Sequence, residues 1–371
     1  MESEKFVLLF SGYNDRAVVA FARTLRACDV RFAIVARDSS DRIFDSDYAD
    51  RIIFTRKSSA LDRRMMSDLL GRVRKIHGEA DCLIAPSTEA LNRFILSERA
   101  FLEAEGITVP LVNEELYAAI SDKSSFTEIC RDFDISVPGE YRSLDDIDFP
   151  FVAKPKKFRS SCGVIHSPLI IPDRSSKERF RKAYDEGDFF FQEYIHGKSI
   201  YLLYHFGRAG SVAKLSQENL VQQPGGKSIV AATTSHFHEE PESEKYETLF
   251  ESLSFRGLVM VEVRQSGSNV CMIEANPRFW GPSQLFVDAG VNLFEEFLYD
   301  HDVIAERPGC TDQKQARYFW YGGFQAALRG PDQLSYYQGT EDEFLSELEE
   351  WISIDVYRRT DTMKIFRRET E

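Results

Sequence analysis

Two glutamates and an asparagine have the types and spacing of a metal site on a β-hairpin. Two strand-like runs, Leu258–Arg264 and Val270–Ala275, flank a candidate three-residue turn at 267–269. If the hairpin is symmetric about the middle of this turn, Glu262 lies directly opposite Glu274. Because two like charges in this position destabilise a sheet, their presence indicates a cation between them.

Side chains alternate between the two faces of a strand, so this hairpin has an apolar face and a polar face. The apolar face holds Val259, Val261, Val263, Cys271, Ile273 and Ala275, and the polar face holds Glu262, Arg264, Met272, Glu274 and Asn276. Carboxylate and amide oxygens are ligands that suit Mg²⁺. Arg278 can reach the polar face, where a guanidinium suits a phosphate or an acyl phosphate. A solvated face on a half-exposed sheet would show the same alternation.

The residues that end the second strand favour the metal site. Residues 274–281 read Glu-Ala-Asn-Pro-Arg-Phe-Trp-Gly, and this run resembles the Glu-x-Asn-Pro-Arg signature of ATP-grasp enzymes. In that family the two acidic positions and the asparagine are metal ligands, and the arginine contacts phosphate. The resemblance therefore implies a metal site at Glu262, Glu274 and Asn276, with Arg278 as a catalytic residue.

Three further segments resemble the nucleotide site of the same family. Asp122-Lys123 opens a predicted helix and resembles the family's first nucleotide lysine. Phe151–Pro155 resembles the strand beneath the phosphates, and the resemblance gives its Lys154 a catalytic role as well. Phe191–Ile195, followed by Gly197, resembles the hinge whose backbone holds the adenine edge. The cofactor-binding residues implied are Lys123, Lys154, Lys156, Ser161, Gln192, Glu193, Tyr194, Ile195 and Ser199.

Two positions depart from the family pattern. The residue two after the hinge glycine is often a glutamate that holds the ribose hydroxyls, and here it is Ser199. Because a neutral hydroxyl supplies no charge, we expect weak discrimination between ribose and deoxyribose. The loop that covers the phosphates is usually rich in glycine, whereas residues 156–163 contain one glycine and several basic and hydroxyl side chains. These side chains can still hold phosphate.

The function that the resemblance implies is an ATP-dependent ligase, most similar to stand-alone carboxylate–amine ligases and carbamoyl-phosphate-synthetase-like proteins. A carboxylate would attack ATP to give an acyl phosphate and ADP, and an amine would then displace phosphate. The expected cofactors are ATP and Mg²⁺, with Mn²⁺ as a substitute. The expected partners are a small carboxylate and an amine, with amino acids or peptides allowed, and a homodimer is allowed too. The alternatives are a phosphotransferase or carboxylase-like enzyme without amide formation, or a non-catalytic nucleotide-binding regulatory protein.

The elements that must position these residues begin with an α/β pattern. The strand-like runs Phe6–Phe10, Val30–Ala36 and Cys82–Ala85 occur with a predicted helix at 15–28, which indicates a parallel sheet. The resemblance implies that this α/β N-terminal domain is a pre-ATP-grasp domain, followed by an α+β ATP-grasp fold whose two subdomains clamp the nucleotide. The expected divisions are 1–120 for the pre-ATP-grasp domain, 121–190 for the small (A) subdomain, 191–309 for the large (B) subdomain with the metal-binding hairpin, and 310–371 for a C-terminal extension packing on the core.

Several polar segments have no assigned chemistry. Residues 216–241 contain Gly225-Gly226 and many polar side chains, so we expect a long mobile loop that closes over the site. His236 and His238 are then expected to be solvated. The basic residues near the C-terminus, Arg358 to Arg368, are expected to form a solvated surface.

Composition bounds the partners and the compartment. The chain has 371 residues, 43% of them hydrophobic, and a formal net charge of -14. This charge argues against a general binder of nucleic acids or anionic membranes, which select basic surfaces. The six cysteines include no Cys-x-x-Cys pair, which fits a reducing compartment. With no signal peptide and no run near the roughly 20 apolar residues of a membrane span, we expect a cytoplasmic protein.

Overall fold

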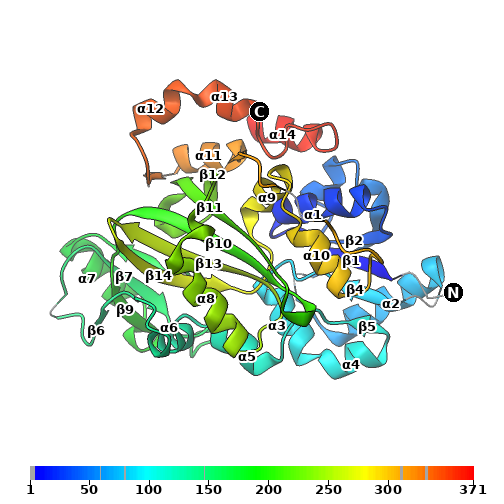
Figure 1. Cartoon of the computed structure of the whole chain (residues 1–371), viewed down its shortest axis with the longest axis horizontal. Helices are drawn as coiled ribbons and strands as arrows, with labels where there is room; N and C mark the ends of the chain where they lie inside the picture. Colours follow the sequence, from blue (N-terminus) through cyan, green and yellow to red (C-terminus); the bar gives the residue numbers. More distant parts are fainter. Residues whose placement is uncertain (1–4, 59, 79–80, 146, 310–311, 331–332) are drawn as a thin grey trace.

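The computed structural model describes residues 5–371 apart from 59, 79–80, 146, 310–311 and 331–332, and its described strands form three sheets (Figure 1). The first is parallel, as the sequence predicts, with strand order β3-β2-β1-β4-β5. Its strands are β1 (Phe6–Phe10), β2 (Phe32–Ala36), β3 (Ile52–Thr55), β4 (Cys82–Ile84) and β5 (Ile107–Thr108). The associated helices are α1 (Asp15–Ala27), α2 (Arg63–His77), α3 (Glu89–Ser97) and α4 (Arg99–Ala104).

The second sheet is small and antiparallel, with strand order β6-β9-β7-β8. Its strands are β6 (Glu140–Tyr141), β7 (Phe151–Pro155), β8 (Leu169–Ile171) and β9 (Phe189–Glu193). Helix α7 (Arg174–Ala183) packs on it through Phe180, which is buried with Phe151 and Phe191. The two strands predicted here, β7 and β9, therefore lie side by side, and they bring the Lys154 strand next to the hinge strand.

The third sheet is large, with strand order β14-β13-β10-β11-β12-β15, and β16 pairs with β11. Its strands are β10 (Lys198–Phe206), β11 (Val212–Gln222), β12 (Ile229–Ser235), β13 (Gly257–Ser266), β14 (Asn269–Asn276), β15 (Arg317–Phe319) and β16 (Ser335–Tyr336). The predicted hairpin is β13-β14, and it forms one edge of this sheet (Figure 1).

Helices cover both faces of the large sheet. On one face, alternate β10 side chains such as Leu202 and Tyr204 pack with α6 (Lys123–Asp132) and α8 (Pro241–Ser252). On the other face, α1 of the first unit packs with α9 (Gln284–Asp288) and α10 (Leu293–Asp300). This second contact joins the parallel sheet to the large sheet through one continuous apolar core.

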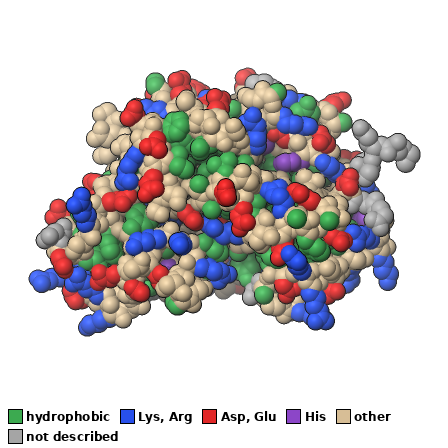
Figure 2. Space-filling model, turned by 90° about the horizontal axis from the view of Figure 1, so that it is seen from below, with side chains coloured by type: hydrophobic (Ala, Val, Ile, Leu, Met, Phe, Trp, Pro, Cys, Tyr) green, Lys and Arg blue, Asp and Glu red, His purple; other side chains and the backbone are tan. Residues whose placement is uncertain are grey.

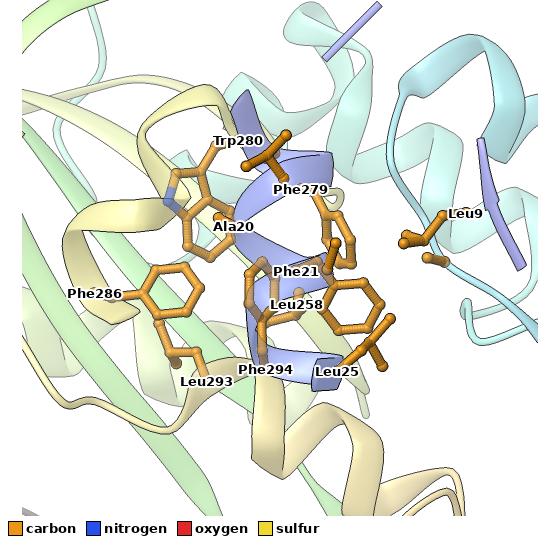
Figure 3. Close-up of a cluster of buried hydrophobic side chains, with 14 of the residues drawn as sticks. Leu9, Ala20, Phe21, Leu25, Leu258, Phe279, Trp280, Phe286, Leu293 and Phe294 are labelled. Carbon is orange, nitrogen blue, oxygen red and sulfur yellow. The ribbon is translucent and has the colours of Figure 1, made fainter. Parts of the chain in front are cut away.

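Aromatic rings dominate this joint. Figure 3 shows Phe21 of α1 among Phe279, Phe286 and Phe294, with Trp280 beside them. The ring of Phe21 lies 4.9 Å from Phe279 and 4.7 Å from Phe294, both edge-on, between ring centroids. Aromatic pairs of this kind add about 0.5–1.5 kcal/mol beyond the area they bury. The residues that follow the hairpin are thus anchored against α1, which fixes where Arg278 emerges.

The segment 216–241 is not a mobile loop, and this prediction is wrong. It contains the end of β11, the whole of β12 and the start of α8. Its polar residues suggested a loop, but Ser216, Gln217 and Asn219 are buried side chains of a strand. Only residues 223–228, around the short turn Pro224–Gly226, lie outside strands between β11 and β12.

His238 is correspondingly buried, contrary to the sequence expectation, and its Nδ1 lies 3.0 Å from the backbone N of Ser216, which donates to it. His236 is exposed, as expected.

The C-terminal extension wraps back over the molecule (Figure 1). It comprises α11 (Tyr321–Leu328), α12 (Glu341–Ser346), α13 (Leu348–Ser353) and α14 (Met363–Thr370). The basic residues Arg358, Arg367 and Arg368 are exposed, as the sequence predicts. Arg368 also pairs with Asp45, and Arg359 pairs with Asp288.

Within the described part of the chain, no helix is long and apolar enough to cross a membrane. On the face shown in Figure 2, acidic and basic side chains are interspersed. That face therefore has no broad basic surface of the kind that nucleic acids select.

Candidate active site

The β13-β14 hairpin places Glu262 opposite Glu274, as the sequence predicts, but the register near its tip differs. The turn has two residues, Gly267 and Ser268, so Ser266 pairs with Asn269. A bulge then restores the predicted pair, because Ile273 has no partner between the pairs on either side of it. A bulge changes which face the residues before it occupy.

The bulge corrects three predicted side-chain positions, the first of which is Cys271, expected on the apolar face but paired with Arg264 of the polar face. Met272 was expected on the polar face, but it pairs with Val263 and is buried in the apolar core. Ile273 was expected on the apolar face, but it is half-buried and lines a cleft with Lys154. Its carbonyl oxygen accepts a hydrogen bond from Nζ of Lys154 at 2.8 Å. The bulge is therefore what gives this buried lysine a fixed acceptor.

Glu274 is the centre of a charged network. Lys123, the first residue of α6, forms an ion pair with its Oε2. The amide Nδ2 of Asn276 donates to its Oε1 at 2.8 Å. Burial by itself raises the pKa of this carboxyl, but the charge and hydrogen bond of Lys123, with the Asn276 amide, bring the pKa down to about 2. Glu274 is therefore ionised at neutral pH.

Glu262 lies deeper and is held differently. Nη2 of Arg264 donates to its Oε1 at 2.9 Å, and the same nitrogen donates to the hydroxyl of Tyr337 at 2.9 Å. Burial raises the pKa of Glu262, partly offset by the Arg264 charge, and Glu274 raises it further. A carboxylate destabilised by burial and by a neighbouring carboxylate is one that a bound cation would stabilise.

Lys154 completes the charged set. It is 5% exposed, and its pKa falls to about 8 because burial disfavours the ammonium ion and Lys123 repels it. With Lys123, it places two ammonium groups beside the two carboxylates. The two ammonium groups can contact and orient a polyphosphate, and the two carboxylates can hold a cation that is bound to it.

Ser199 belongs to a buried polar chain on the same face of the sheet. Its hydroxyl lies 3.4 Å from Oε1 of Glu262, and Nδ2 of Asn219 donates to it at 2.9 Å. Nε2 of Gln217 in turn donates to Asn219 at 2.6 Å. Sequence reasoning missed Gln217 and Asn219 because it placed them in a loop. The residues beside them, Ser216 and Glu218, are polar too, so this segment has no alternation of polar and apolar side chains that could have indicated a strand.

A narrow cleft runs between the small sheet and the hairpin. It is lined by Val152 and Ile170 from the small sheet, by Tyr194 and Ile195 of the hinge, and by Glu262 and Glu274. Gln192 also lines this cleft, and it is 1% exposed with no partner among the described residues for its side-chain amide. Burying an amide without partners is costly. This orphaned amide fits a planar ligand that offers both a donor and an acceptor.

A second cavity, of about 620 Å³, lies between the parallel sheet and the large sheet. Glu274, Asn276 and Arg278 line it, so it adjoins the charged network. Arg278 is held by hydrogen bonds from Nη2 to Oδ1 of Asn276 at 3.1 Å and from Nη1 to the carbonyl of Phe279 at 3.0 Å. The hairpin therefore presents carboxylates to the narrow cleft and a guanidinium to the larger cavity.

Comparisons with known proteins gave matches in structure. No family model and no curated protein sequence matches this chain. An ADP complex of purK, an N5-carboxyaminoimidazole ribonucleotide synthetase, matches with a TM-score of 0.63 and 11% identity over 95% of this chain and 98% of that chain. The biotin carboxylase domain of Hydrogenobacter thermophilus 2-oxoglutarate carboxylase matches with a TM-score of 0.61 and 14% identity over 84% of this chain and 72% of that chain. The synthetase from Thermotoga maritima matches with a TM-score of 0.54 and 16% identity over 84% and 78%.

The chain has the ATP-grasp fold. The narrow cleft lies between its two antiparallel sheets, and the parallel sheet is the N-terminal domain that precedes them. At these identities the likeness concerns the fold, so the roles of individual residues rest on the geometry described above.

The predicted residues of the ATP-grasp phosphate loop lie apart from the cleft. Nζ of Lys156 donates to the carbonyl of Gly187 at 2.9 Å. Ser161 donates to Asp188 through its backbone N at 2.9 Å and through its hydroxyl at 3.2 Å. Both residues are exposed, and neither lines the cleft. Glu193 does line the cleft, although its side chain is exposed and lies 3.4 Å from the backbone N of Gly139.

Two residues that help to form the site, Tyr337 and Arg16, lie in segments to which the sequence analysis assigned no chemical role. Tyr337, beside β16 in the C-terminal extension, stacks under Arg264 at 4.2 Å from the guanidinium carbon to the ring centre. Arg16 of α1 donates to Ile229 and Ser228, and a Cβ on Gly281 would lie 2.8 Å from its Nη2. The glycine at the end of the signature run is therefore required for Arg16 to reach its place.

Among the described residues, no group of three His, Cys, Asp or Glu side chains has the arrangement of a metal site. The predicted set differs in kind, since it has two carboxylates and one carboxamide. Glu262 and Glu274 face each other, and Asn276 already contacts Glu274. This set fits a hard cation such as Mg²⁺, whose remaining ligands are water and phosphate oxygens.

Proposed function

We propose that this protein is an ATP-dependent ligase that joins a carboxylate to an amine through an acyl phosphate. The observation that carries the proposal is the hairpin, where Glu262 and Glu274 lie opposite each other beside Lys123 and Lys154, and Arg278 faces a separate cavity. Such an arrangement has one place for a polyphosphate and an adjoining place for an acceptor. The likeness to solved ATP-grasp structures, among them complexes with ADP, supports it.

ATP would lie in the narrow cleft. The hinge backbone at Tyr194 and Ile195 and the unpartnered amide of Gln192 would hold the adenine edge, with Val152 and Ile170 against its faces. Lys123 and Lys154 would contact the phosphates. We propose Glu262, Glu274 and Asn276 as Mg²⁺ ligands, and the bound ion would neutralise phosphate charge during transfer.

The acceptor would lie in the larger cavity with its carboxylate at Arg278. A carboxylate oxygen attacks the γ-phosphorus of ATP, the bond from that phosphorus to the β,γ-bridging oxygen breaks, and ADP leaves with that electron pair. The product is an acyl phosphate. An amine then attacks the acyl carbon, phosphate leaves, and the amine loses a proton to give the amide. The protein's part is positioning and charge stabilisation, since Lys154 and Arg278 are fixed by hydrogen bonds on either side of the hairpin.

The turn between β11 and β12 is the segment we propose to shield the intermediate from water. Gly225 and Gly226 line the narrow cleft, and Gly226, Lys227 and Ser228 line the larger cavity. It takes over, in a shorter form, the role first expected of residues 216–241. Exclusion of water would protect the acyl phosphate from hydrolysis.

We also propose that residues 1–120, 121–190, 191–309 and 310–371 are the functional divisions. The parallel sheet falls within the first range, whereas β9 of the small sheet crosses from the second range into the third. β15 and β16 of the last range complete the large sheet. Lys156, Ser161 and Glu193 remain proposed nucleotide contacts, and for Lys156 and Ser161 this requires the loop to leave Gly187 and Asp188.

A carboxylase-like reaction is the second candidate, because biotin carboxylase domains share the fold. ADP release from ATP decides between the candidates. Release that requires both a carboxylic acid and an amine supports the ligase. Release with bicarbonate or another acid alone, unaffected by any amine, supports a carboxylase or phosphotransferase. ATP binding without turnover across a broad pool of acids and amines supports a regulatory protein.

A further inference from the structure

The larger cavity contains three guanidinium groups that have no acidic partner. Arg16, Arg56 and Arg278 all line it, and none lies within ion-pair distance of a carboxylate among the described residues. Every hydrogen bond from these side chains goes to a neutral oxygen. In a chain with a net charge of -14, three such groups in one cavity indicate a site for an anion.

The acidic side chains in and near the same cavity already have other partners. Glu89 accepts from Nε of Arg93 at 3.0 Å, and Glu274 is paired with Lys123. Asp41 lies near Arg56, but its carboxylate accepts from the hydroxyl of Ser11 and from two backbone N–H groups. These carboxylates therefore form no ion pair with the three guanidiniums, although Asp41 acts on Arg56, and Glu369 on Arg16, from beyond ion-pair distance.

Arg56 is the least satisfied of the three. It follows β3 in the N-terminal domain and is 5% exposed, and its Nε has no hydrogen-bond partner among the residues that the structure describes. Within that part of the chain its side chain makes a single, long hydrogen bond, 3.4 Å from Nη2 to the carbonyl of Ser11. Burial lowers the pKa of this guanidinium, which agrees with a charge that lacks a counter-ion. Nε and Nη2 form one edge of the guanidinium, and such an edge binds a carboxylate or phosphate through two parallel hydrogen bonds.

Arg56 belongs to the N-terminal domain, and Arg278 follows the hairpin of the large sheet. Most of the surface that lines the cavity around them is apolar. Phe10, Leu61, Phe158, Tyr201 and Met260 are among its lining residues. Arg278 adjoins the charged network, whereas Arg56 lies beside the loop that follows β1. The cavity therefore offers two separate anion contacts, Arg56 and Arg278, in a lining that also includes the charged residues Arg16, Glu89 and Lys227.

We infer that the acceptor is a carboxylic acid with a second anionic group, which Arg56 binds while the reacting carboxylate lies at Arg278. This inference rests on the proposed function for the role of Arg278, and it assigns to the same site a substrate class, the dianionic acids. The second group is a carboxylate or a phosphate, since both match the guanidinium edge. The N-terminal domain thus contributes the residue that selects the substrate.

Binding measurements test this inference. Dicarboxylic acids of increasing chain length, the matching phosphonate-bearing acids, and monocarboxylic acids of equal length are titrated into the full-length protein with Mg²⁺ and a non-hydrolysable ATP analogue, with heat as the readout. We expect one of the dianionic series to bind at least about tenfold more tightly than the monocarboxylic acids. The two dianionic series distinguish a carboxylate from a phosphate at Arg56.

Substitution of Arg56 then locates the effect. In Arg56→Gln the preference for the dianionic acid falls to about twofold or less, while affinity for the monocarboxylic acid is unchanged. Arg51→Gln is the matched control, since Arg51 precedes the same strand, is half exposed and pairs with Asp50. If Arg56→Gln does not fold, Arg56→Lys keeps the charge, loses the double hydrogen bond and should lose most of the preference.

Two results would overturn the inference: equal wild-type affinity for mono- and dianionic acids, or an equal loss of both in Arg56→Gln. Because heat of binding is measured without turnover, a failure of the proposed ligase reaction is seen separately, as absence of ADP release with acids that do bind.

Discussion

The narrow cleft and the larger cavity differ in whether their charged side chains form ion pairs within the protein. In the cleft both carboxylates have a charged partner, with Lys123 on Glu274 and Arg264 on Glu262. In the cavity Arg56 and Arg278 make hydrogen bonds to neutral oxygens alone. Residues of the same hairpin line both spaces, so this difference in charge pairing occurs within one structural element.

This difference indicates how each space meets its ligand. A ligand of the cleft replaces internal ion pairs, so its binding exchanges one set of charge contacts for another and depends on a cation between the carboxylates. A ligand of the cavity adds contacts that the free protein lacks. Removal of a cleft residue should therefore affect both the protein and the reaction, whereas removal of a cavity residue should mainly affect the choice of acceptor.

We expect the largest loss of ADP release from substitutions in the hairpin. Glu274→Gln keeps the shape of the side chain but removes the charge that a metal needs, and Asn276→Ala removes the neighbouring oxygen. We expect each variant to lose at least about a hundredfold in ADP release at saturating Mg²⁺. Glu251→Ala, at an exposed position of α8, is the control and should match the wild type. Wild-type rates in either hairpin variant would remove the metal assignment.

Lys154 should set the affinity for ATP. Lys154→Ala removes a buried charged donor, and we expect ATP binding to weaken by about 1.5–3 kcal/mol. Calorimetric titration of ATP measures this change directly. Lys245→Ala is the control, since Lys245 is partly exposed and forms an ion pair with Glu242 on the surface of α8. An unchanged dissociation constant would place the phosphates elsewhere.

The pH dependence follows from the same residue. The lowered pKa of Lys154, about 8, means that its ammonium ion is present below that pH and is lost as pH rises through it. Since the charged form binds phosphate, the affinity for ATP should fall above about pH 8. Lys154→Arg should bind ATP with little change between pH 7 and 9, because arginine keeps its charge. A wild-type affinity that stays level across this range would count against the contact.

The C-terminal contribution to the cleft should be smaller. Tyr337→Phe removes the hydroxyl that accepts from Arg264 and donates to Gln222. We expect a loss of about 0.5–1.5 kcal/mol in the free energy of unfolding, measured by urea titration. Tyr299→Phe is the comparison, since Tyr299 belongs to α10 and its ring also lies beside an arginine, 5.2 Å from the guanidinium carbon of Arg208. A larger loss in ATP affinity than in stability would mean that Tyr337 touches the nucleotide itself.

The smallest effect is expected at the ribose. Ser199 is buried between Glu262 and Asn219, and it is a neutral group at the position where the resemblance to ATP-grasp enzymes leads us to expect a carboxylate. We therefore predict that dATP is nearly as good a substrate as ATP, as judged from the ratio of their kcat/KM values. A preference for ATP above about 30-fold, or roughly 2 kcal/mol, would mean that another group holds the ribose hydroxyls.

The sequence predicts the parts of this molecule that depend on short-range patterns. The alternation along 258–276 predicted the hairpin and the Glu262–Glu274 pair, which the structure confirms. It could not predict the bulge at Ile273, since a two-residue turn and a three-residue turn fit the same residues and the choice depends on packing of Met272 in the core. The buried polar chain at Gln217 and Asn219 was missed because burial of polar side chains depends on partners distant in the sequence.

The larger cavity could not be predicted either, because its lining residues are distant from one another in the sequence. Arg16 and Arg56 belong to the N-terminal domain, and nothing in their local sequence indicates that they meet Arg278. β3, the strand before Arg56, was missed altogether, as its residues are half exposed and show no clear alternation. Contacts between domains are set by the whole fold, so these residues could be assigned only from the structure.

Transfer of oxygen from the acceptor carboxylate to phosphate tests the central claim most directly. A carboxylic acid that supports ADP release in the presence of an amine is labelled with ¹⁸O in its carboxylate, and the released phosphate is analysed by mass. If the reaction passes through an acyl phosphate, each phosphate carries one oxygen from the carboxylate and the product amide keeps the other. Phosphate without the label, formed together with amide, would show that the carboxylate never attacked the γ-phosphorus and would contradict the account.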